Sequence, residues 1–161
     1  MKLLYVLVGA LCLLGIGYYF GISTTEPDLD DASIATSIFQ RAKAKHLDGN
    51  WGTMDIYTDF ETRTHGTERM FTALTEVMPG EALHPAHRHY EEEFLLVTKG
   101  NGVWSLNGES IVANTGDLLY VKPWEMHGLT NTGKDTLNFF VIRWNSKGQE
   151  KVPEPEGDHG E

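Results

Sequence analysis

The sequence predicts an all-β domain, built either as a two-sheet sandwich or as a small antiparallel barrel. From Trp51 onward, short runs rich in Thr, Val, Ile and aromatic residues follow one another. Gly, Asn and Pro separate these runs at a spacing of about 8–12 residues, which is typical of sandwiches and barrels. The sequence has no phosphate-binding Gly-rich loop, nucleophile elbow or repeat period that would favour another class.

The expected strands alternate with turn signals between Met54 and Trp144. The clearest turn is Asn107-Gly108, a dipeptide that favours a two-residue hairpin. We therefore place one barrel domain over residues 51–144. Its expected strands are Met54–Phe60, Arg69–Met78, Phe94–Lys99, Val103–Leu106, Glu109–Ala113, Leu118–Val121 and Thr136–Trp144.

One short helix is expected before the barrel, over Ala32 to Lys45, within a linker region of residues 24–50. Asp30 and Asp31 are suitable N-caps, and Ile34, Ile38, Phe39 and Ala42 form an apolar stripe at helical spacing. Such a helix would pack against the barrel or against a partner chain. After the barrel, the acidic, Pro-containing residues 145–161 are expected to be a disordered tail.

The N-terminal residues 1–23 contain a nearly unbroken apolar run, Leu3 to Ile22, preceded by Lys2. About 20 apolar residues can span a bilayer as a helix. The run is read either as a signal anchor, which is slightly favoured, or as a cleaved signal peptide. Both alternatives place the domain outside the cytoplasm, either anchored at the bacterial cell envelope or secreted into the periplasm.

The charge balance limits the classes of partner. The 161 residues include 13 Lys and Arg against 23 Asp and Glu, a formal net charge of -10. This balance argues against nucleic acid or an anionic membrane surface as a partner. A small-molecule substrate or ligand is expected instead. Cys12 is the single cysteine, so no disulfide can form within the chain.

Potential metal ligands gather between Gly80 and Gly100. Imidazole nitrogens and carboxylate oxygens bind divalent metals such as Zn, Fe, Mn and Ni. His87 and His89 would leave an extended strand on the same face, and a short turn would bring Glu93 beside them. His127, which follows a separate expected strand, would complete the set.

The order of these residues resembles the two motifs of the cupin superfamily, specifically bacterial single-domain cupins of the type 2 conserved-barrel kind. The similarity covers roughly Met78 to Trp144. In the first motif, His87-x-His89 is followed after three residues by Glu93 and after six more by Gly100. The second motif retains Gly116, His127 and Asn131. The second motif departs from the pattern at Lys122 and Trp124, which occupy its Pro and Gly positions. In the first motif, the leading glycine, Gly80, lies one position early.

The resemblance implies a cupin β-barrel, also described as a double-stranded β-helix or jelly roll. It also implies one divalent metal ion, Fe, Mn, Zn or Ni, bound by His87, His89, Glu93 and His127. Cupins commonly dimerise, so a homodimer through an edge strand or the Ala32 to Lys45 helix is expected.

Other residues near the motifs are weaker candidates. His84 and Glu92 are candidate proton carriers, and Trp124 is a candidate substrate-binding residue at the cavity mouth. Glu91 and Glu92 are read as a solvated turn, with the alternative that one of them holds a ligand's ring N–H.

Two classes of function remain open. The first is a metal-dependent enzyme acting on a small organic molecule, as a dioxygenase with a redox metal or as an isomerase or lyase with Zn or Mn. The second is a non-catalytic module that binds or senses a ligand such as a carbohydrate.

Overall fold

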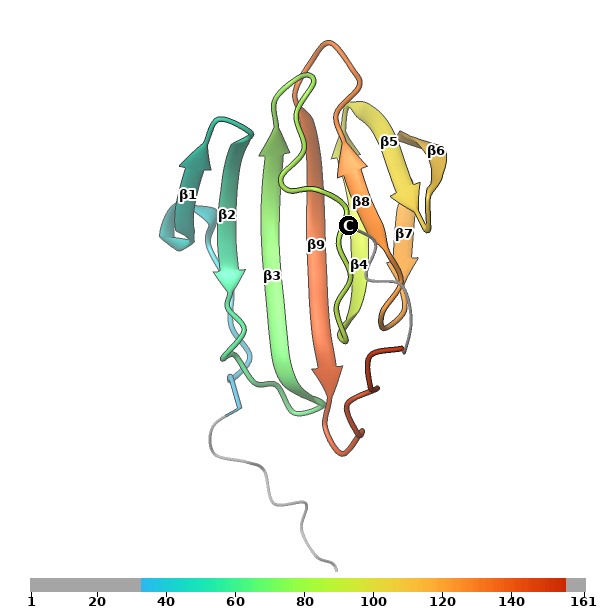
Figure 1. Ribbon diagram of the computed structural model, residues 1–161. Helices are drawn as coiled ribbons and strands as arrows, with labels where there is room; N and C mark the ends of the chain where they lie inside the picture. Colours follow the sequence, from blue (N-terminus) through green and yellow to red (C-terminus); the bar gives the residue numbers. More distant parts are fainter. Residues whose placement is uncertain (1–32, 156–161) are drawn as a thin grey trace, which may run out of the picture. The chain divides into compact units, whose positions relative to one another are not determined.

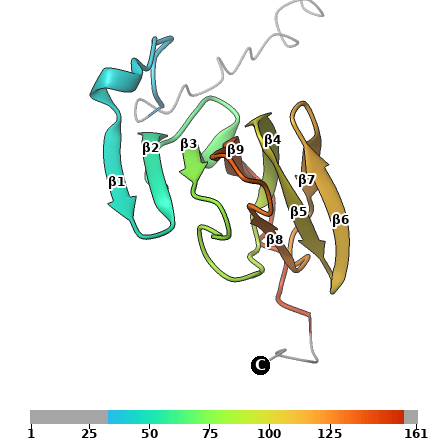
Figure 2. The ribbon, with the colours of Figure 1, turned by 90° about the horizontal axis from the view of Figure 1, so that it is seen from above.

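Nine antiparallel strands in two sheets form the part of the chain that the computed structural model describes, residues 33–155. Their bounds are β1 Lys45–Gly49, β2 Gly52–Thr58, β3 Thr67–Val77, β4 Glu92–Lys99, β5 Asn101–Leu106, β6 Glu109–Asn114, β7 Leu118–Val121, β8 His127–Thr130 and β9 Leu137–Ser146. The larger sheet has the order β1-β2-β3-β9-β4-β7 and the smaller one β6-β5-β8. The smaller sheet lies against the β9, β4 and β7 part of the larger sheet, with β1 and β2 beyond it (Figures 1 and 2). The predicted all-β class is confirmed.

Alternating burial explains why these segments pair as strands with one face inward. On β9, Leu137, Phe139 and Val141 are buried, and the residues between them are partly exposed. The smaller sheet adds Trp104 and Leu129 to the same core. Each large apolar side chain contributes about 1.5–3 kcal/mol when it is buried. The core between the sheets therefore holds them together.

The strand register brings together residues that are far apart in sequence. Glu93 lies on β4, and His127 is the first residue of β8. The loop between β3 and β4 carries His87, which forms an isolated antiparallel bridge with His127. In this bridge the backbone N–H of each histidine donates to the carbonyl of the other at 2.9 Å. The loop is thereby fixed along β8.

The helix predicted over Ala32 to Lys45 is wrong for the residues that the structure describes. Only Arg41–Lys43 form a single 3-10 turn, η1, and β1 begins at Lys45. Ser33 instead bridges Arg63 in parallel orientation. The apolar stripe also fails as a buried helix face, because Ile38 is 91% exposed.

The predicted membrane segment, residues 1–23, lies outside the described residues. Within residues 33–155, no helix is long and apolar enough to span a membrane.

The segment after β9 differs from the expected disordered tail as far as Pro155. The carboxylate of Glu154 lies 3.1 Å from the Arg88 guanidinium. The indole Nε1 of Trp124 donates to the Val152 carbonyl at 2.8 Å. These polar contacts hold the segment along the barrel, which composition alone could not predict.

Candidate metal centre and adjoining cavity

Three histidines from two elements converge on one point. His87 and His89 come from the loop before β4, and His127 comes from β8. One ring nitrogen of each lies within 4.8 Å of the others. His89 and His127 are buried, with 7% and 2% exposure, and His87 is partly buried. The three histidines are therefore positioned to bind a metal ion, as their spacing predicted.

Backbone carbonyls fix the tautomers of two of these rings. His89 Nδ1 lies 3.1 Å from the Glu91 carbonyl oxygen, and His127 Nδ1 lies 2.9 Å from that of Glu125. A carbonyl only accepts hydrogen bonds, so each Nδ1 carries the proton and each Nε2 presents a lone pair. Both Nε2 atoms are buried and have no hydrogen-bond partner. A buried acceptor without a partner is costly, and a metal ion would satisfy both atoms.

The carboxylate of Glu93 faces the same two nitrogens. Its oxygens lie 3.2 Å from His127 Nε2 and 3.4 Å from His89 Nε2. Burial raises the Glu93 pKa, but in the metal-free site hydrogen bonds and positive charge from His127 and His89, when those rings carry a proton on Nε2, outweigh burial and lower it to about 2. An ionised carboxylate and unprotonated nitrogens are all acceptors. These three acceptors can lie this close together only if a cation lies between them or one ring carries a second proton. Two imidazole nitrogens and a carboxylate are ligands that suit a divalent metal.

The third imidazole, that of His87, is held in its neutral form near neutral pH. Burial, followed by the neighbouring rings of His84, His127 and His89, lowers the pKa of His87 to about 4. Its Nδ1 is buried and unpartnered. A neutral imidazole is the form that coordinates metals, so little proton release is needed for binding near neutral pH.

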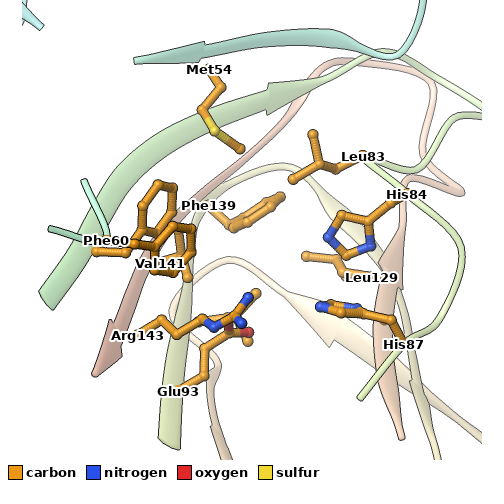
Figure 3. A pocket seen from close by; sticks show the side chains of 13 residues that line it. Met54, Phe60, Leu83, His84, His87, Glu93, Leu129, Phe139, Val141 and Arg143 are labelled. Atoms are coloured by element: carbon orange, nitrogen blue, oxygen red, sulfur yellow. The ribbon is translucent and has the colours of Figure 1, made fainter. Parts of the chain in front are cut away.

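A cavity of about 200 Å³ opens beside His87 and Glu93. Its wall is mostly apolar, and its polar residues are these two together with His84 and Arg143. Figure 3 shows Arg143 and Glu93 on one side, facing His84 and His87 across the cavity. The apolar lining residues are Met54, Phe60, Phe71, Leu83, Leu95, Leu129, Phe139 and Val141. The arrangement can hold a small molecule next to a bound metal.

The weaker predicted candidates separate in the structure. His84 lies at the exposed rim of the cavity, with its ring 4.1 Å from that of His87. Glu92 is outside the cavity lining, where it accepts a hydrogen bond from the Tyr120 hydroxyl at 2.6 Å. Trp124 is also outside the lining, because its indole is bonded to Val152.

Glu91 and Arg143 are the residues that sequence reasoning placed poorly. Glu91 is 2% exposed, so the solvated-turn interpretation is wrong for it. Its carboxylate lies 3.4 Å from His89 Nδ1 and 2.7 Å from the Arg143 guanidinium. Arg143 was not identified at all. The sequence feature that could have identified it is its place on the last strand: Arg143 follows the buried Val141 by two residues and therefore shares its inward face.

A protein-family model described as Cupin domain matches residues 73–143. A gentisate 1,2-dioxygenase from a Streptomyces species is 34% identical over 45% of this chain and 20% of that protein. An oxalate-binding protein from Thermotoga maritima is 29% identical over 48% of this chain and 64% of that protein. The chain thus spans less than two thirds of the length of either relative. The dimethylsulfoniopropionate lyase DddW of Ruegeria pomeroyi is 32% identical over 68% of this chain and 80% of that protein.

Solved structures support the fold. An RmlC-like cupin from Shewanella frigidimarina superposes with a TM-score of 0.56 at 14% identity, over 71% of this chain and 95% of the other. The polyketide cyclase RemF from Streptomyces resistomycificus gives a TM-score of 0.56 at 20% identity, over 76% of this chain and 89% of the other. At these identities the similarity concerns the fold alone.

Proposed function

The chain belongs to the cupin superfamily, and we propose that it is a metal-dependent enzyme of the lyase type that acts on a small carboxylate. The observation that carries this proposal is the buried group of acceptors formed by His89 Nε2, His127 Nε2 and the Glu93 carboxylate. This group borders a cavity large enough for a small organic molecule only.

The relatives favour a carboxylate and, more narrowly, a lyase. Gentisate, oxalate and dimethylsulfoniopropionate, which appear in the names of the three relatives, all carry a carboxylate group. The lyase is matched over 80% of its length, against 20% for the dioxygenase and 64% for the oxalate-binding protein. We therefore take dimethylsulfoniopropionate as the first substrate to test.

Four side chains would hold the metal: His87, His89, Glu93 and His127. When bound, the ion supplies positive charge that polarises a coordinated carboxylate and makes the adjacent C–H more acidic. The carbonyls of Glu91 and Glu125 keep His89 and His127 in the tautomer that presents Nε2. Because these partners are backbone atoms, the orientation is rigid.

His84 is the residue best placed to accept the proton. Its Nδ1 lies 2.9 Å from the Pro85 carbonyl oxygen and therefore carries the hydrogen, which leaves Nε2 free to accept. The ring faces the cavity beside His87 (Figure 3). In an elimination, His84 takes the proton next to the carboxylate and the C–H electron pair forms a C=C bond. The bond to the leaving group on the β carbon breaks, and that group departs with the bonding pair.

The test is product release by protein loaded separately with Fe(II), Mn(II), Zn(II) or Ni(II). With dimethylsulfoniopropionate as substrate, gas chromatography would detect dimethyl sulfide and liquid chromatography would detect acrylate. We expect at least one metal form to be active. His84→Gln should lose turnover by about 100-fold or more, as for removal of a general base, and should keep its metal. Absence of both products with all four metals would refute the lyase assignment for this substrate.

A non-catalytic carboxylate-binding module is the second candidate. The similarity to an oxalate-binding protein over 64% of that protein favours it. Calorimetric titration with oxalate, combined with oxygen-uptake assays, separates the alternatives. Tight oxalate binding without product or oxygen consumption would support the binding module, and oxygen uptake would support a dioxygenase.

Placement at the cell envelope forms part of the proposal. Its support is the apolar run Leu3 to Ile22 preceded by Lys2. Fractionation of cells that express the full chain tests it, because recovery in the cytoplasmic fraction alone would contradict it.

A further inference from the structure

We infer that Arg143 forms an anion-binding subsite in the cavity, which takes the carboxylate of the bound molecule beside the metal centre. The inference deepens the proposed function, on which its role in a reaction rests.

The strand pairing places Arg143 beside the metal centre. Arg143 on β9 is the direct cross-strand partner of Glu93 on β4. Paired residues of adjacent strands direct their side chains to the same face of the sheet. Both side chains accordingly line the cavity and lie side by side on one wall of it (Figure 3).

Two contacts hold the guanidinium in place before any ligand binds. One of its terminal nitrogens donates to the Glu91 carboxylate at 2.7 Å. Its central carbon lies 4.9 Å from the centre of the Phe60 ring, and Phe60 stacks on Phe71 at 4.6 Å. A guanidinium supported on an aromatic face and paired with a buried carboxylate loses little freedom when a ligand binds.

The guanidinium keeps donor capacity for a ligand. It has five N–H donors in a planar fork that matches a carboxylate. The Arg143 side chain is 21% exposed, and its Nε is buried without a hydrogen-bond partner among the described residues. Because Arg143 lines the cavity and only one terminal nitrogen is used by Glu91, terminal N–H donors of the guanidinium are left for a carboxylate there.

The local charges favour an anion once a metal is bound. The Glu91 carboxylate has Arg143 at 2.7 Å and Arg69 at 3.9 Å. These two arginines and the two buried glutamates, Glu91 and Glu93, cancel in formal charge. A divalent ion therefore leaves the site with an excess of positive charge, in a largely apolar cavity where charge interactions are strong.

Cavity size narrows the ligand to small carboxylates. At about 200 Å³, the cavity is below the range of about 300–1,000 Å³ that holds drug-sized ligands. A carboxylate with a short carbon chain fits both this size and the apolar walls. A sugar or an aromatic carboxylate with several polar substituents would lack partners there.

The test compares two probes of the same shape, propionate and propionamide, by calorimetric titration into the full chain loaded with Zn(II). We expect the parent protein to bind propionate at least tenfold more tightly than propionamide. Arg143→Gln should weaken propionate binding by about tenfold or more, as for loss of a charge-assisted hydrogen bond, and leave propionamide unchanged.

Arg69→Gln is the matched control. It also removes a positive charge next to Glu91, but Arg69 lies outside the cavity lining and donates to the Tyr90 hydroxyl at 2.8 Å. Its propionate affinity should fall by much less than that of Arg143→Gln, because Arg69 has no donor in the cavity and the metal still leaves an excess of positive charge. The absorption spectrum of the Co(II)-loaded variants should match that of the parent and thereby show an intact metal centre. Should Arg143→Gln unfold, Arg143→Lys retains the charge without the planar fork and should still bind propionate several-fold more weakly.

The outcomes separate this inference from the proposed function. Equal propionate affinity in the parent and in Arg143→Gln or Arg143→Lys, or no preference of the parent for propionate, would overturn the subsite even in an active enzyme. Selective propionate binding that depends on Arg143, in a protein that releases no product, would overturn the lyase activity and leave the subsite standing.

Discussion

At the residue scale, the candidate metal centre is marked by buried imidazole nitrogens that have no hydrogen-bond partner among the described residues. His127 is 2% exposed, and its Nδ1 is committed to the Glu125 carbonyl. The ring therefore cannot turn its other nitrogen toward solvent without breaking that bond. Glu93 Oε1 lies 3.2 Å from the free nitrogen. A side chain fixed in this way is positioned to bind a metal ion through Nε2.

The first prediction is that His127→Ala loses metal. Removal of one imidazole deletes a ligand and leaves Glu93 with fewer partners, so metal content should fall at least tenfold from about one ion per chain. Mass spectrometry of the purified, dialysed protein measures this content. His65→Ala is the control, because His65 is exposed and lies outside the site. Full metal content in His127→Ala would show that the centre is wrongly assigned.

The second prediction concerns the stability of the metal-free protein. Burial lowers the His87 pKa from 6.5 to about 4. Between these values the unfolded chain binds a proton that the folded chain does not, so the free energy of unfolding falls as the pH is lowered. The Glu93 pKa is lowered from 4.5 to about 2, so the same loss continues over that lower interval.

Urea denaturation at pH steps from 7 to 3, with a chelator present, measures this dependence. His87→Gln lacks the titrating group, so its stability should change less between pH 6.5 and 4. The loss at lower pH, which belongs to Glu93, should remain in that variant. An identical pH slope in the parent and in His87→Gln would contradict the role given to His87.

At the element scale, the sequence predicted seven of the nine strands that the described residues form and missed β1 and the four-residue β8. β5 and β6 flank the predicted Asn107-Gly108 turn, where both residues have positive φ. β1, Lys45–Gly49, is exposed along its whole length and carries no alternating pattern. It exists because it pairs with β2, and pairing with a distant element leaves no signal in the strand itself.

The failed helix has a related cause. The apolar residues of the 32–45 segment are spaced as in an amphipathic helix, but the helix would need a surface on which to bury them. The segment instead follows the larger sheet, where Ile34 N–H donates to the Arg63 carbonyl at 2.8 Å. Arg41 pairs with the buried Asp55 at 2.6 Å. Helix propensity is a weak prior that such tertiary contacts override.

The site residues also divide into those that the sequence predicted and those that it could not predict. The spacing of His87, His89 and His127 in the two motifs was sufficient to predict that they meet, although His87 and His89 lie in a loop and not on the expected extended strand. Arg143 and Glu91 could not be assigned, since their roles depend on cross-strand pairing and burial. Trp124 was placed at the cavity mouth from its position near His127, whereas its φ of 67° turns it toward the Val152 segment.

The third prediction belongs to the pairing of β5 with β8. A Cβ on Gly102 would lie 2.3 Å from the Thr130 carbonyl oxygen, so Gly102→Ala must push β8 away from β5. Overpacking of this kind costs about 1–3 kcal/mol, and β8 also carries His127. We expect a lower free energy of unfolding in denaturant titrations and weaker metal binding. Gly66→Ala is the control, because no heavy atom lies within 4 Å of its added Cβ. Equal stability of the two variants would contradict this account of β5–β8 packing.

At the scale of the described chain, the two sheets enclose the cavity, and the segment after β9 contacts the loops on either side of the candidate metal centre. The Lys151 Nζ lies 4.0 Å from the centre of the Tyr90 ring. Tyr90 directly follows His89 in the sequence. Trp124, held by Val152, donates its backbone N–H to the His89 carbonyl at 2.7 Å. The segment thus contacts the β3–β4 loop, which carries His87 and His89, and the β7–β8 loop, which leads into His127.

The fourth prediction is that these contacts slow metal release. Truncation after Gly148 removes Val152, Lys151 and Glu154, which contact Trp124, Tyr90 and Arg88, but leaves β9, which ends at Ser146, intact. The circular dichroism spectrum should therefore be unchanged. Transfer of Zn(II) to a chromophoric chelator should become about fivefold faster, because one hydrogen bond contributes ~1 kcal/mol. Truncation after Pro155 is the control, since it keeps the contacts of Val152 and Glu154. If both truncations released Zn(II) at the same rate, residues 149–155 would have no part in holding the metal loops, and their contacts would be surface contacts only.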